Sequence, residues 1–166
     1  RVTLSAGEST ESAGGAVSMV SGYGRATDSG AFSVRSADGG ANGASGLLHF
    51  STGTATAGST GAITLRSGPA TGGAGGSVSM VVGRGDTASG GRVTISAGEA
   101  TGAASTGGAV SVVSGYGRAT SSGAFSIRTA DAGGNGVSGS LTFASGSATK
   151  GSSGALTLRS GVATGG

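Results

Sequence analysis

The chain has 166 residues, of which 39 are Gly, and only 10% of its residues are charged and 4% aromatic. Such a composition offers little bulky apolar area for a compact core, while the absence of Cys excludes disulfide bonds and thiolate metal sites. The net charge of +3 is thinly spread without a Lys/Arg run, which argues against nucleic acid as a partner, and the lack of a long apolar stretch predicts no membrane span.

Repeated units of about 15 residues make up the whole chain. The series begins with RVTLSAGESTESAGG, AVSMVSGYGRATDSG, AFSVRSADGGANGASG and LLHFSTGTATAGSTG, and continues with AITLRSGPATGGAGG and SVSMVVGRGDTASGG. Arg1 then returns as Arg92, where RVTISAGEATGAASTGG starts a second series. We therefore predict one continuous array over residues 1–166, with a block at 1–91 and a partial duplicate at 92–166. We expect this array to be a segment of a longer chain.

Each unit begins with a short alternating run. Counting from the first residue of a unit, positions two and four are large and apolar, as in Val2 and Leu4, and position three is Ser or Thr except at His49. Alternation with a period of two predicts a strand with one buried face. The remaining residues are rich in Gly, Ser, Ala and Thr, which predicts a turning segment, or corner.

One unit is too small to bury its own apolar face, so the units are expected to stack. Near-constant unit length favours an all-β fold, a β-solenoid, over a meander of antiparallel hairpins. Position five alternates between Ser or Arg in odd units and mostly Val in even units, which predicts two units per coil and two parallel sheets face to face. Aromatic residues at positions two and four are expected to point into the core between these sheets: Phe32, Phe50, Phe125 and Phe143.

Arginines at position five of odd units would form a ladder along one sheet. Stacked Arg side chains repel one another, so a compensating negative charge is expected. One source is the acidic residue at position eight of odd units, such as Asp38 or Asp131; the alternative is an acidic or sulfated polysaccharide held by the guanidinium forks. The ladder consists of Arg35, Arg66, Arg128 and Arg159.

Position five of even units predicts a second surface. A flat apolar strip on a repeat protein is typical of a contact face, although Val also simply suits strands. We interpret this strip as a surface for lateral association, formed by Val20, Val81, Val113 and Ala144.

No pattern indicates catalysis, a cofactor or a metal site. His49 is the only His and occupies an outward position, and the many Ser hydroxyls have no recurring base beside them. The segments DGGANG and DAGGNG do not reproduce a calcium-binding repeat. The tripeptide Arg84-Gly85-Asp86 resembles an adhesion ligand, but it lies where other corners vary freely, so we interpret it as ordinary corner variation.

The segment SGPATGGAGGSVSMVVG, from Ser67 to Gly83, resembles the Gly/Ser/Thr/Ala-rich repeats of extracellular β-solenoid fibrils and flagellar hairs of algae and other stramenopiles. The resemblance implies a secreted structural filament component. Because an uncapped solenoid exposes unpaired strand edges, we expect a structural or adhesive fibre protein, extracellular or at the cell surface, that assembles with copies of itself end to end, with the strip at position five as its lateral contact. Two alternatives are an ice-binding solenoid, whose Thr column is interrupted by Arg25, Asp86 and Arg118, and a glycan-binding surface protein.

Overall fold

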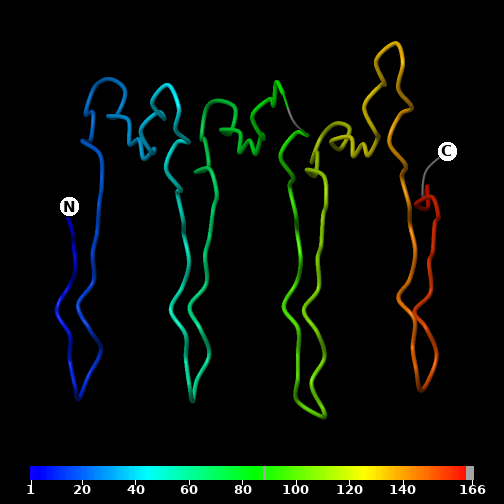
Figure 1. The fold of residues 1–166 in the computed structure, drawn as a ribbon, viewed down its shortest axis with the longest axis horizontal. Coiled ribbons are helices and arrows are strands. Elements are labelled where there is room, and N and C mark those ends of the chain that lie inside the picture. The colour runs from blue at the N-terminus through cyan, green and yellow to red at the C-terminus, as the bar shows by residue number, and fades with distance from the viewer. Residues whose placement is uncertain (88, 164–166) are drawn as a thin grey trace. The chain divides into compact units, whose positions relative to one another are not determined.

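The computed structural model describes residues 1–87 and 89–163, and these residues contain no helix and no β-strand. Extended runs alternate with short bends and turns, so the chain is mostly coil (Figure 1). The expected all-β solenoid is therefore wrong for the single chain, because neighbouring runs do not exchange the ladder hydrogen bonds that define a strand. The chain forms two units, Arg1–Met80 and Val81–Gly166.

Four of the Gly-rich corners in the described part of the chain form loops closed by a backbone hydrogen bond. A closed loop runs from position seven of a repeat to its last Gly, and the N–H of that Gly donates to the position-seven carbonyl. In this way Gly15 binds Gly7 and Gly108 binds Gly98, each with an N–O distance of 2.9 Å. The same bond joins Gly30 to Gly22 and Gly123 to Gly115. The chain thus leaves and re-enters each of these loops at nearly the same place.

The base of each loop brings the last Gly against the residue at position six. A Cβ added to Gly15 would lie 3.1 Å from the Cβ of Ala6, and one added to Gly108 would lie 3.3 Å from the Cβ of Ala97. Only a residue without a side chain fits such an approach comfortably. Five residues at position six are among the few half-buried ones of the described chain: Ser21, Ser36, Ala97, Ser114 and Thr129.

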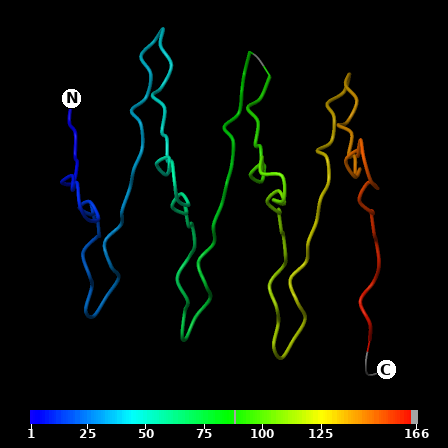
Figure 2. The same ribbon diagram turned by 90° about the horizontal axis from the view of Figure 1, so that it is seen from below.

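Within Arg1–Met80, successive loops point to different sides. The loop segments 7–15 and 52–61 share one side in Figure 1. In Figure 2 the segments 22–30 and 67–76 share a side, opposite to 36–46. A loop direction therefore recurs at the third following repeat of this unit and not at the second. The alternation at position five consequently does not mark the two faces of a flattened two-repeat coil, which corrects the expected layout.

No buried core is present among the described residues. The accessible surface is 16438 Å², whereas a folded domain of 15.1 kDa exposes about 7,100 Å² and its extended chain about 22,000 Å². The four Phe residues expected in the core are each more than half exposed, from 57% for Phe32 to 68% for Phe50, with Phe125 and Phe143 between them. The single chain therefore does not bury them.

Candidate interaction surfaces

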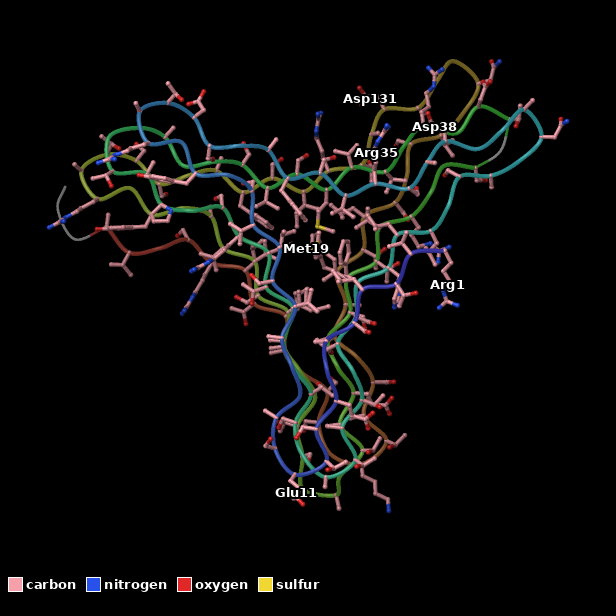
Figure 3. All side chains as sticks on the ribbon, turned by 90° about the vertical axis from the view of Figure 1, so that its left-hand side faces the viewer. Arg1, Glu11, Met19, Arg35, Asp38 and Asp131 are labelled. Carbon is pink, nitrogen blue, oxygen red and sulfur yellow. The ribbon has the colours of Figure 1, made fainter. Side chains whose placement is uncertain are left out.

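The extended runs present two different apolar surfaces. In the run at 109–113, Val110 is 56% and Val112 is 64% exposed, whereas the adjacent Val113 is 85% exposed. The first unit repeats this order, because Val17 and Met19 are less exposed than Val20. Positions two and four therefore face the more crowded side of a run, and position five faces outward. Figure 3 shows Met19 near the middle of the view and Glu11 at the outer tip of its loop.

The position-five apolar residues all lie on extended runs just before a loop begins. Val20 belongs to the first unit, and the other three members of the expected lateral strip belong to the second: Val81, Val113 and Ala144. All four side chains are exposed. Their role as a lateral contact stays a prediction, because no second molecule is present to contact them.

The position-five arginines are also exposed: Arg35, Arg66, Arg128 and Arg159. Arg35 leads into the loop segment 36–46 and Arg66 into 67–76, and these segments point to opposite sides in Figure 2. The arrangement of these arginines as one ladder stays a prediction. Figure 3 shows Arg35 and Asp38 in the same arm of the structure, where sequence analysis paired them for charge compensation.

Features suited to small ligands are few in the described part of the chain. A cavity of about 300 Å³ is lined by Phe143, Leu156, Thr157 and Leu158, and none of these side chains is ionisable. Residues 1–87 and 89–163 contain no group of three or more His, Asp or Glu able to hold a metal ion. His49 is exposed in an extended run, and Arg84-Gly85-Asp86 is exposed in the sixth loop. The extended apolar runs are thus the most extensive feature available for binding.

None of the described residues forms a helix long and apolar enough to cross a membrane. No protein-family model matches the chain, and no similar curated protein or solved structure was found. Any proposal about what the chain does therefore rests on its own residues.

The closed loops and their tight bases are features that the sequence interpretation missed. A signal for them is present, because every complete repeat ends in Gly and position six is occupied mostly by Ser, Ala or Thr. Small residues recurring at two separated positions are typical of a close backbone approach. That reading would have predicted a loop closed at its base in place of an open corner.

Proposed function

We propose that this protein is a structural component of an extracellular filament and that it assembles with copies of itself. The observation that carries the proposal is the regular exposure of apolar side chains: every large apolar residue of the chain is at least 43% exposed, and these residues recur in each repeat. Exposed apolar area of this extent is typical of an interaction surface. The extracellular location rests on the likeness to fibril repeats.

Repetition itself supports a structural role. Because the same surface returns at regular intervals along the chain, each copy offers many equivalent contact points to its neighbours. Weak individual contacts then add up along the molecule, as they do in other repetitive assemblies. A filament needs this kind of surface, whereas a single binding pocket would not need it in every repeat.

Electron microscopy of the purified chain tests the proposal. We expect elongated filaments of uniform width, and we expect the double variant Val20→Asp and Val113→Asp to reduce their bundling by placing charge on the lateral strip. The variant Thr27→Asp and Thr120→Asp, which places the same charges in the loops, is the matched control. Isolated short particles at every protein concentration would contradict the proposed function.

A further inference from the structure

The single chain leaves most of its surface and much of its backbone uncovered. Its 16438 Å² of accessible surface is about three quarters of the extended-chain value, whereas a domain of about 150 residues buries roughly 70% of that value. None of the backbone hydrogen bonds among the described residues involves positions one to five of a repeat. The extended runs therefore carry free N–H and C=O groups beside exposed apolar side chains.

A free extended edge of this kind is a template for pairing with another chain. The apolar side chains must also be buried if the backbone is to be ordered, because their burial is the main favourable contribution that offsets the lost conformational entropy. The surface exceeds that of a folded domain by several thousand Å², which is the scale of an obligate interface and far above the ~1,600 Å² of a standard one.

We propose that copies of this chain cover one another by laying their extended runs side by side, so that positions two and four are buried between copies. The free backbone groups of the runs pair in the same contact. This inference rests on the proposed filament function and identifies the surface that builds it. It differs from a coil wound by one chain, because the partner of each run comes from another molecule.

Several properties of the runs favour a second copy as the occupant. Positions two to four carry no Asp, Glu, Lys or Arg in any repeat, so identical runs meet there without like-charge repulsion. The same apolar spacing recurs in every repeat, so a run of one copy matches a run of another at several registers. In the four repeats whose loops are closed by a hydrogen bond, the loop returns to its base and leaves the run before it as a separate extended segment open to a partner.

The run at 109–113 provides a double variant, and an exposed loop residue of the same type provides its control. Val110→Thr with Val112→Thr removes apolar area from positions two and four, while Val137→Thr makes the same kind of change in a loop, where Val137 is 96% exposed. Thr keeps the shape and the preference for extended backbone, so the comparison isolates apolar burial.

Sedimentation and light scattering over a dilution series measure the mass of each protein in solution. We expect the wild type to form an oligomer, and we expect the double variant Val110→Thr/Val112→Thr to raise the protein concentration at which it dissociates by at least about tenfold. Val137→Thr is expected to leave that concentration unchanged within about twofold. A double variant that dissociates at the same protein concentration as Val137→Thr would overturn the inference.

Wild-type dilution followed by circular dichroism removes any ambiguity from misfolded variants. The extended-backbone signal is expected to fall together with the mass, because the runs are ordered by their neighbours. A monomer that keeps this signal overturns the inference. Electron microscopy reports on the filament role separately: oligomers that never elongate would refute the proposed function and leave the side-by-side contact intact.

Discussion

Gly24 lies where a side chain would collide with the backbone. A Cβ added to Gly24 would approach the carbonyl oxygens of Thr27 and Asp28, at 2.6 Å from the former, whereas one added to Gly22 would meet nothing within 4 Å. We expect Gly24→Ala to lower the free energy of unfolding of the assembled protein by about 1–3 kcal/mol, because the loop must shift to relieve the clash.

Gly22→Ala is the control for this variant and is expected to change that free energy by less than about 0.5 kcal/mol. Urea unfolding at a fixed protein concentration provides both values. Gly117 and Gly115 offer the same comparison in the second unit, since a Cβ on Gly117 would also meet backbone carbonyls and one on Gly115 would not. Equal losses for the two members of a pair would contradict the close approach seen in the structure.

The position-five arginines allow a test of the polysaccharide alternative. If Arg35 and Arg66 bind an anionic polysaccharide, Arg35→Gln with Arg66→Gln should weaken binding to a sulfated glycan, because Gln lacks the charged planar fork. Binding by the wild type should also weaken as salt is added, since exposed charges are screened. Arg84→Gln is the control, because Arg84 lies in a loop outside this set.

Surface plasmon resonance on an immobilised sulfated glycan measures these affinities. Wild-type protein that does not bind, or a double variant that binds as well as Arg84→Gln, would favour charge compensation by Asp38 and its equivalents. Exposed ion pairs of that kind contribute only about 0–1 kcal/mol, so the variants would then change stability little.

Residue periodicity predicts that position five faces outward from its sheet, and in the single chain Val20 is 86% and Val113 85% exposed. It did not predict the exposure of Phe32 and Phe125. Alternation along a run shows which side chains share a side, but it does not show whether the covering surface belongs to the same chain. The sequence therefore identified side chains that need to be buried, but it did not show which molecule buries them.

At the level of elements, a closed loop allows the number of loop residues to change without moving the run that follows. The loop of the seventh repeat is longer than that of the first, yet Gly108 reaches Gly98 at 2.9 Å just as Gly15 reaches Gly7. We therefore expect insertion of Gly-Ser between Glu11 and Ser12 to leave the oligomer mass unchanged, because the insertion lies at the tip of a loop.

A one-residue insertion between Val17 and Ser18 should have the opposite result. It reverses the alternation of the run, so that position four exchanges sides with position five. Loss of the oligomer is expected, measured by light scattering beside the loop insertion. An oligomer of unchanged mass after the insertion in the run would contradict the need for alternating side chains there.

Sequence reasoning predicted strands that alternate with Gly-rich corners, but the described residues contain no strand. It was wrong about how the elements combine. The parity of Arg35 and Val20 suggested two faces, yet the loops of Arg1–Met80 recur in direction at every third repeat. The alternation between odd and even repeats at position five reflects a local difference in side chains. The direction of each loop depends on its backbone angles, which composition does not specify.

At the scale of the whole molecule, stability should depend on protein concentration. A chain that buries its apolar surface only against other copies is stabilised by mass action, so the urea midpoint should rise with each tenfold increase in protein concentration. Unfolding followed by circular dichroism at several concentrations measures the trend. A midpoint independent of concentration would indicate that each chain is stable by itself.

The duplicated repeats were evident from the sequence, but the fold of the single chain was not a solenoid. Repetition predicts that equivalent surfaces exist in every unit, as Val17 and Val110 illustrate. It does not distinguish a chain whose repeats pack on one another from a chain whose extended runs stay exposed, because both need the same spacing of apolar residues. The distinction depends on the path of the chain between runs, and therefore on the closed loops.

Those loops also affect how such a molecule can change over generations. A codon gained or lost at a loop tip alters the outermost chemistry of the protein, while Gly7 and Gly15 still meet at the base and the run that follows keeps its alignment. Arg84-Gly85-Asp86 lies in the exposed corner of the sixth repeat. The exposed loop residues can therefore change during evolution while the contacts between copies stay the same.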